Sequence, residues 1–437
     1  MKSKLWLGVL ALVLAAGGTA LTALYANGNS NADDVADDQV PAADAAAPDP
    51  AAITRGAYVA VQGDCAACHT KPGGNAYAGG YGLQTPFGVI YSTNITPERD
   101  TGIGTWTERD FFRAVRHGKR QDGALLYPAM PYNAYVKMND ADLHDLWAYI
   151  RSLKPVAQAP TPNTLGFPYN IRLAMLGWNL LYFKNAPYVA EPGQPAQWNR
   201  GRYLVDGAGH CGACHTPKDA LGGDTSAYLQ GAELLGGYAP EITGNPHVGV
   251  GSWSIEQVAQ YLKVGSNHMA VAAGAMGEAV EHSTQYLNGP DLAAIAVYLE
   301  SLPGSGAQAP AAISANDPAM LRGAHIYETQ CMACHNVQGQ GIDGMVTGFA
   351  DNPGIRALSP SNLISTVLKG GRAAVTEGNV TGAGMPSFAW RLDDADIAAV
   401  LTYVRNSWGN AAPAVGSPLV SKARAAVHAE PVLDKQR

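Results

Sequence analysis

Three copies of one short motif contain every cysteine of the chain. The motif is Cys-x-x-Cys-His, and it occurs in "GDCAACHT" (63–70), "GHCGACHT" (209–216) and "TQCMACHN" (329–336). Its cysteines are Cys65, Cys68, Cys211, Cys214, Cys331 and Cys334. The histidines that follow are His69, His215 and His335. Two thiols on one helical turn beside an imidazole can bind a metal or a cofactor, so we expect the functional sites of the protein at these three motifs.

Three kinds of chemistry use cysteines in this arrangement. Six cysteines in an exported chain could close three disulfides, and each motif could supply zinc ligands. The motif is also the attachment signal of c-type haem, in which two thiols bond one porphyrin and the histidine ligates its iron. A disulfide framework has no use for the histidines, and no further cysteine exists for a structural zinc site. We therefore predict three covalently attached haem c groups.

A second axial ligand for such a haem usually comes from further along the chain, and methionine is the common choice in electron transfer. The candidates are Met130, Met276 and Met385. The first two follow the first cysteine of their motif by 65 residues and the third by 54. Each is expected in a loop just before the last helix of its unit. In the middle unit Met269, His268 and His282 compete with Met276 for this role.

The chain around the motifs repeats as well. Arg-Gly followed by apolar residues at helical spacing leads into each motif, and Thr54 and Asn199 are expected to cap the first two of these helices. A middle helix is predicted at 107–118, 254–265 and 359–371. An amphipathic last helix, opened by Asn or Asp, is predicted at 139–153, 288–302 and 392–408. Strand-like alternation is scarce, so the predicted fold class is mainly α.

These repeats predict three haem domains in tandem. In chain order we expect a signal peptide or membrane anchor (1–26), an acidic Ala/Pro tether (27–50), domain 1 (51–160), a linker with an apolar helix (161–195), domain 2 (196–305), a linker (306–316), domain 3 (317–412) and a C-terminal tail (413–437). The apolar linker segment is too short to span a bilayer. It is either buried between domains or a docking surface for a partner or the membrane.

The N-terminal residues indicate the compartment of the protein, and its net charge limits the class of partner. Residues 5–26 are apolar and suit either a cleavable signal, whose core has roughly 7–15 residues, or a spanning helix, which needs about 20. Both place the rest of the chain outside the cytoplasm. The net charge is −7 and no basic block occurs. Nucleic-acid binding is not expected, because phosphate contacts need clustered Lys and Arg.

Four stretches carry a resemblance to a known family: "CAACHT", "YSTNITPERDTGIGTWTERDFFRAVRHGKRQDGALLYPAMPY", "HCGACHTP" and "STQYL". They are similar to the triple-haem cytochrome c subunit of membrane-bound periplasmic dehydrogenases of acetic acid bacteria and their relatives. The resemblance covers about residues 52–412. It implies three tandem class I cytochrome c-like domains and axial pairs of His69 with Met130, His215 with Met276, and His335 with Met385.

The same resemblance implies the partners and the place of action. Electrons would come from a catalytic quinoprotein, flavin or molybdopterin dehydrogenase subunit and pass along the haems to membrane ubiquinone. The expected partners are that subunit, a small third subunit, ubiquinone and the cytoplasmic membrane, on whose periplasmic side the protein would lie.

A six-coordinate His/Met iron has no open position, which suits electron transfer rather than substrate chemistry. No enzymatic activity is therefore expected from this chain alone. Two alternatives stay open: a multihaem peroxidase, which needs one vacant iron position, and a haem subunit of another respiratory complex.

Overall fold

The computed structural model describes residues 49–429. Within them the backbone is mostly helical, and its strands form short antiparallel hairpins, so the predicted mainly α class is confirmed. The predicted signal or anchor (1–26) and nearly all of the predicted tether (27–50) lie outside the described residues. No helix between residues 49 and 429 is long and apolar enough to cross a membrane.

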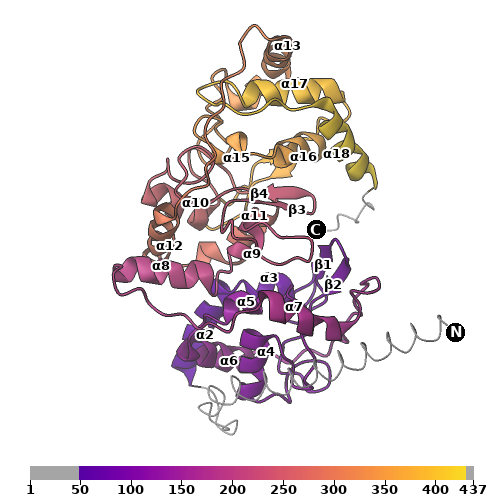
Figure 1. The fold of residues 1–437 in the computed structure, drawn as a ribbon, viewed down its shortest axis with the longest axis vertical. Helices are drawn as coiled ribbons and strands as arrows, with labels where there is room; N and C mark the ends of the chain where they lie inside the picture. Colours follow the sequence, from indigo (N-terminus) through magenta and orange to yellow (C-terminus); the bar gives the residue numbers. More distant parts are fainter. Residues whose placement is uncertain (1–48, 430–437) are drawn as a thin grey trace, which may run out of the picture.

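One order of elements occurs three times, and the three repeats follow one another along the long axis of the molecule (Figure 1). Repeat 1 contains α2 (Pro50–Gln62), α3 (Cys65–His69), β1 (Gly82–Thr85), β2 (Gly88–Tyr91), α4 (Glu108–His117), α5 (Tyr132–Tyr135) and α6 (Asp140–Ser152). Its hairpin pairs Gly82 with Tyr91 and Thr85 with Gly88. The linker that follows contains η1 (Arg172–Ala174) and α7 (Met175–Tyr182).

Repeats 2 and 3 follow the same plan with different loops. Repeat 2 contains α8 (Ala196–Asp206), α9 (Gly212–His215), β3 (Ala232–Leu234), β4 (Gly237–Ala239), α10 (Ile255–Val264), α11 (Gly274–His282), η2 (Thr284–Tyr286) and α12 (Gly289–Ser301). Repeat 3 contains α13 (Pro318–Ile326), η3 (Tyr327–Cys331), α14 (Met332–His335), α15 (Pro353–Arg356), α16 (Ser361–Lys369), β5 (Gly371–Arg372), β6 (Gly384–Met385) and α17 (Asp394–Val404).

The C-terminal tail adds a helix to repeat 3. This helix, α18 (Ser417–Ala429), packs against α16 and α17, and Val420 is fully buried in the core of the repeat. The Arg424 guanidinium donates to the Asp394 carboxylate at 2.6 Å. Part of the predicted tail (413–437) therefore belongs to the folded unit.

A glycine lies where the first helix of each repeat crosses the last. A Cβ atom at this place would lie 1.8 Å from the facing carbonyl oxygen for Gly56, 1.9 Å for Gly201 and 2.3 Å for Gly323. Real Cβ atoms do not come so close, so only glycine allows the two backbones to meet here. These are the glycines of the repeated Arg-Gly lead-in.

The arginine of the same lead-in ties the first helix to the last. Its guanidinium donates to an aspartate of the last helix in every repeat. The three pairs are Arg55–Asp145 at 2.6 Å, Arg200–Asp291 at 2.8 Å and Arg322–Asp396 at 2.7 Å. The Arg-Gly pair thus combines a close backbone crossing with an ion pair beside it.

Side-chain capping explains where several of the longer helices begin. Thr107 and Ser254 open α4 and α10 with capping boxes, and these helices lie within the predicted 107–118 and 254–265. The predicted caps at Thr54 and Asn199 are wrong. The first helix begins at Pro50, because Asp49 accepts from the Ala51 N–H and proline suits the first turn, and α8 begins after Pro195.

Candidate functional site

Each Cys-x-x-Cys-His motif forms a short helical turn directly after the first helix of its repeat. These turns are α3, α9 and α14, with the first cysteine of the last two motifs immediately before the turn. All six thiols are free, so no disulfide forms among them. In each pair the first cysteine is half-buried and the second is exposed. The two thiols of each turn are therefore available to one ligand, as thioether attachment of a porphyrin requires.

The histidine of each motif is held by a main-chain carbonyl oxygen. The distance from Nδ1 is 2.7 Å for His69 to Thr93, 2.7 Å for His215 to Pro240 and 3.4 Å for His335 to Thr347. A carbonyl can only accept, so Nδ1 carries the proton and Nε2 is left as the ligating nitrogen. Burial lowers the pKa of all three histidines, which favours the neutral imidazole that ligates a metal.

A glycine holds each histidine from its backbone side. Its N–H donates to the histidine carbonyl oxygen at 2.7 Å from Gly79, 2.9 Å from Gly231 and 3.1 Å from Gly341. All three glycines have φ between 66° and 88°, in the left-handed region. The loop after each motif therefore turns back at a glycine and brings the carbonyl acceptor under the imidazole.

In repeats 1 and 3 the predicted methionine packs against the same apolar cluster as the first cysteine of its own motif. Met130 lies in the turn before α5 and packs against the same apolar cluster as Cys65. Met385 lies in β6 and packs against the same cluster as Cys331. Both side chains are half-buried. A thioether and a motif cysteine thus share one apolar core in each of these repeats.

Repeat 2 differs from the expected arrangement. Met276 lies in helix α11 rather than in a loop, because residues 274–282 form a helical turn after the left-handed Gly274. Its side chain packs against a small cluster formed by Ala272 and Val280 of repeat 2 and Ala374 of repeat 3. Met269 is 6% exposed and belongs to the cluster that contains Cys211. The competing His268 and His282 are exposed.

The donor set can be tested against the cofactor that the motifs imply. Among residues 49–429, no three His, Cys, Asp or Glu side chains are placed to hold a metal ion together. Each motif instead offers two free thiols and one imidazole with Nε2 available, and each has a thioether in the same core, which in repeat 2 is that of Met269 and not that of Met276. This set fits a covalently attached haem with histidine and methionine as axial ligands.

Comparison with known proteins decides the family. A family model described as cytochrome c matches residues 53–154 and 320–408, which are repeats 1 and 3. The fructose dehydrogenase cytochrome subunit of Gluconobacter japonicus is 41% identical over 85% of this chain and 82% of its own. This chain belongs to the family of cytochrome c subunits of dehydrogenases.

Two further members of this cytochrome c subunit family cover the chain to a similar extent. The gluconate 2-dehydrogenase cytochrome c subunit of Pantoea cypripedii is 40% identical over 83% of this chain and 87% of its own. The cytochrome c subunit of a quinone alcohol dehydrogenase from Gluconacetobacter polyoxogenes is 38% identical over 84% and 82%. All three are cytochrome subunits of dehydrogenases, so this cytochrome c subunit is an electron-transfer component rather than an enzyme on its own.

Some residues around the sites of this cytochrome c subunit escape sequence reasoning. The carbonyl acceptors at Thr93, Pro240 and Thr347 are main-chain atoms, which leave no mark on residue type. A signal did exist for two tyrosines, Tyr58 and Tyr203, which stand at the same place in "RGAYV" and "RGRYL".

Proposed function

We propose that this chain is the three-haem electron-transfer subunit of a membrane-bound dehydrogenase complex. It receives electrons from the catalytic subunit and delivers them to ubiquinone at the periplasmic side of the cytoplasmic membrane. The observation that carries the proposal is the threefold repetition of one geometry, a Cys-x-x-Cys turn followed by a histidine whose Nδ1 binds a carbonyl oxygen. The family membership of the chain supports the role in electron transfer.

Each proposed site combines residues of one repeat. The axial pairs are His69 with Met130, His215 with Met276, and His335 with Met385. Each histidine and methionine pair would hold a haem iron, and such an iron would exchange single electrons without a free coordination position for substrate. The carbonyl acceptors fix the imidazole orientation and make the ligating nitrogen more basic. The predicted units 51–160, 196–305 and 317–412 are then the three haem domains, the last of them extended by α18.

The relatives indicate the class of the catalytic partner. Their names assign them to dehydrogenases of fructose, gluconate and alcohol. We therefore propose that the catalytic partner of this chain oxidises a sugar, a sugar acid or an alcohol. A small third subunit completes the proposed complex.

The test of this function is isolation of the native complex. We expect haem-dependent peroxidase staining of this chain on a denaturing gel and a mass that exceeds the apo-chain by three porphyrins. All three irons should be low-spin, and a large dehydrogenase subunit should co-purify. A high-spin ferric signal at rest would favour the peroxidase alternative instead, and a copper–haem oxidase as the bound partner would favour another respiratory complex.

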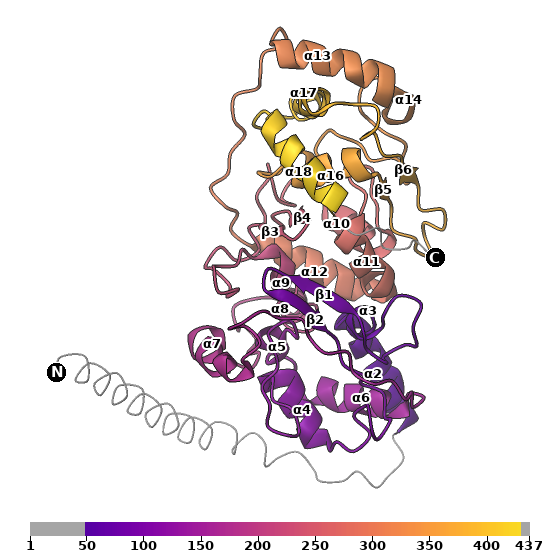
Figure 2. The same cartoon turned by 90° about the vertical axis from the view of Figure 1, so that its right-hand side faces the viewer.

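The linker between repeats 1 and 2 supports the proposed contact with the membrane. One face of α7 packs on the repeats, where Asn179 accepts from the Tyr132 hydroxyl at 2.6 Å and Trp178 donates to the Leu221 carbonyl oxygen at 3.1 Å. The linker also leaves large apolar residues exposed: Phe167 at 81% and Leu173 at 71% before α7, and Leu180 at 78% and Leu181 at 65% within it. Figure 2 shows α7 at the outer edge of the molecule.

We propose that these four side chains form a bilayer contact, called here the linker face. Leu and Phe beside basic residues are typical of helices that lie in the membrane interface. The charged residues between 164 and 190 are Arg172 and Lys184, with no acidic side chain, although the whole chain carries −7. An anionic lipid surface therefore fits the linker face by charge as well as by apolar area.

Changing two leucines of the linker face tests this contact. The variant Leu180→Glu/Leu181→Glu is expected to bind vesicles containing anionic phospholipid at least about tenfold more weakly, because two exposed leucines of the proposed bilayer contact are replaced by negative charges. Co-sedimentation measures the affinity. Leu321→Glu in α13, where the leucine is 58% exposed, is the control and should bind normally. Equal binding of all forms would rule out the linker face as the membrane contact.

A further inference from the structure

Repeats 1 and 2 touch through equivalent residues in opposite directions. The Tyr58 hydroxyl of repeat 1 donates to Asp291 Oδ2 at 2.8 Å and accepts from the Asn288 N–H at 3.1 Å. The Tyr203 hydroxyl of repeat 2 donates to Asp142 Oδ2 and accepts from the Asn139 N–H at 3.1 Å. Each tyrosine thus binds the capped end of the last helix of the other repeat.

The residues of this contact correspond one to one. Both tyrosines stand three positions after the arginine of the lead-in, and both aspartates stand three positions after the Asn cap of the last helix. When residue i contacts j and the equivalent of j contacts the equivalent of i, the interface has two-fold character. Repeats 1 and 2 therefore pack as a homodimer would, within one chain.

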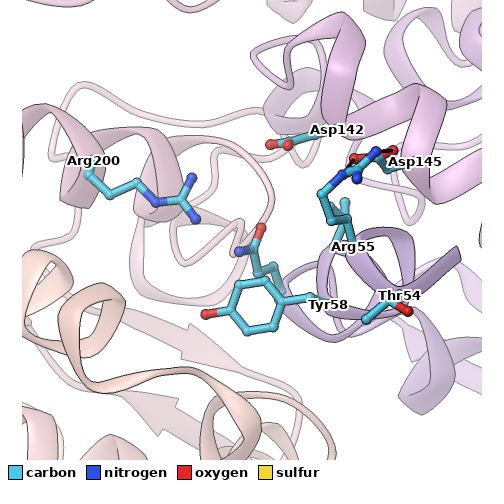
Figure 3. Close-up of a pocket in the computed structure, with 8 residues that line it drawn as sticks. Thr54, Arg55, Tyr58, Asp142, Asp145 and Arg200 are labelled. Carbon is cyan, nitrogen blue, oxygen red and sulfur yellow. Dashed lines mark hydrogen bonds and ion pairs between the residues drawn. The ribbon is translucent and has the colours of Figure 1, made fainter. Parts of the chain in front are cut away.

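The surroundings of this contact are shared between the two repeats. A cavity of about 320 Å³ lies beside it, and its walls include Arg55 and Asp142 of repeat 1 and Arg200 of repeat 2. Figure 3 shows Tyr58 and Arg200 reaching into it from opposite sides. The Arg200 guanidinium donates to Asp291, so this carboxylate is held by both repeats.

Burial keeps both tyrosines in the form that donates. Burial raises the pKa of Tyr58 to about 12, and it raises the pKa of Tyr203 further above the usual range. Both hydroxyls are therefore protonated at any physiological pH. The contact consists of neutral phenols bound to carboxylates, a charge-assisted hydrogen bond that is stronger than one between neutral groups.

The same interface brings two cysteine motifs together. The Tyr135 hydroxyl donates to the Gly63 carbonyl oxygen at 2.9 Å, and its ring packs at 5.6 Å on the ring of His210. Gly63 lies two residues before Cys65, and His210 directly precedes Cys211. The Ser283 hydroxyl of repeat 2 also donates to the Val61 carbonyl oxygen at 2.6 Å. The docking of the repeats thus fixes the positions of the motif turns of repeats 1 and 2 relative to each other.

Repeat 3 lacks the reciprocal tyrosine contact. His325, which is exposed, stands where repeats 1 and 2 have tyrosine. Repeat 3 meets repeat 2 through other groups: Asn362 exchanges two hydrogen bonds with the backbone of Tyr238, and the Val375 N–H donates to Glu281. Within residues 49–429 the reciprocal tyrosine contact is a property of repeats 1 and 2 alone.

We propose that Tyr58 and Tyr203 are positioning residues that fix the spacing between the sites of repeats 1 and 2 and so make them a coupled redox pair. This inference rests on the proposed function, because it assumes a haem on each motif. Electron exchange between two haems slows steeply as their edges move apart. A docking that holds both motif turns in one place therefore sets the rate between them.

The test removes the two hydroxyls and keeps the rings. In the variant Tyr58→Phe/Tyr203→Phe we expect electron exchange between the first two haems to slow about tenfold. The lost bonds loosen the docking of the repeats, and one of them leaves the buried Asp291 carboxylate with one donor fewer. Flash reduction of the native complex gives the rate, and paramagnetic resonance of the oxidised form gives the magnetic interaction of the two irons, which should weaken. His325→Phe is the control at the equivalent place and should change neither.

Haem content and low-spin spectra separate this inference from the proposed function. A double variant with three haems and an unchanged exchange rate would overturn the positioning role alone. Absence of haem from the native chain would overturn the proposed function itself. If the double variant does not fold, the single variants Tyr58→Phe and Tyr203→Phe, each of which keeps one bond, carry the same comparison, and unchanged rates in both would overturn the inference.

Discussion

Replacement of Met276 by histidine is expected to lower the reduction potential of one haem and to leave the other two unchanged. Imidazole stabilises ferric iron more than a thioether does, and axial ligands span roughly 0.8 V across haem proteins. A decrease on the order of 0.1–0.2 V is the expected share of that range for one ligand. A potentiometric titration that resolves three waves measures it. Met130→His and Met385→His should each lower a different wave.

Met269 provides the matched control for this experiment. It is buried in the core of repeat 2 with Cys211, whereas Met276 packs beside repeat 3. Met269→Leu conserves volume, so it should cost under about 1.5 kcal/mol and leave all three waves and the low-spin spectra unchanged. A high-spin iron in Met269→Leu, with no shift in Met276→His, would transfer the ligand role to Met269.

Replacement of Gly201 by alanine is expected to destabilise repeat 2 by about 3 kcal/mol or more. The new Cβ would lie 1.9 Å from the Ala294 carbonyl oxygen, and this atom is backbone of α12, which cannot move aside alone. Helices α8 and α12 must separate, and the Arg200–Asp291 pair is strained with them. Thermal unfolding measures the loss of stability, and haem stoichiometry reports whether repeat 2 still forms.

Gly177 in α7 provides the control, because the same change to alanine is expected to raise the stability there. No atom lies within 4 Å of a Cβ at this position, so Gly177→Ala meets only open space. Alanine is the better helix former, and a gain of about 0.5–1 kcal/mol is expected. If Gly201→Ala were as stable as the native protein, the close helix crossing would not be what selects glycine there.

The sequence predicted well where local chemistry decides the structure. The prediction of 107–118 compares with the observed Glu108–His117, and that of 254–265 with Ile255–Val264. Both helices begin at capping boxes and end at left-handed glycines, so residues close in sequence determine both ends. The motif cysteines and histidines were visible for the same reason, since their spacing is local.

Prediction from the sequence is limited where distant residues or main-chain groups determine the structure. The start of α2 depends on Asp49 and Pro50, which lie upstream of the repeated lead-in that drew attention to Thr54. The choice between Met269 and Met276 depends on which core each side chain enters, and this follows from tertiary packing. The carbonyl oxygens that hold the histidines belong to loops of different length, 24 residues after His69 but 12 after His335.

The reciprocal docking of repeats 1 and 2 has an evolutionary consequence. In a dimer of identical chains every substitution occurs twice, so both halves always change together. Here both halves are encoded in tandem, and each can diverge while the shared geometry persists. Asp64 and His210 illustrate this, since both precede the first cysteine with left-handed backbone, at φ of 48° and 36°. One place has a carboxylic acid and the other an imidazole, so the proposed haems of repeats 1 and 2 would meet different neighbours on a shared scaffold.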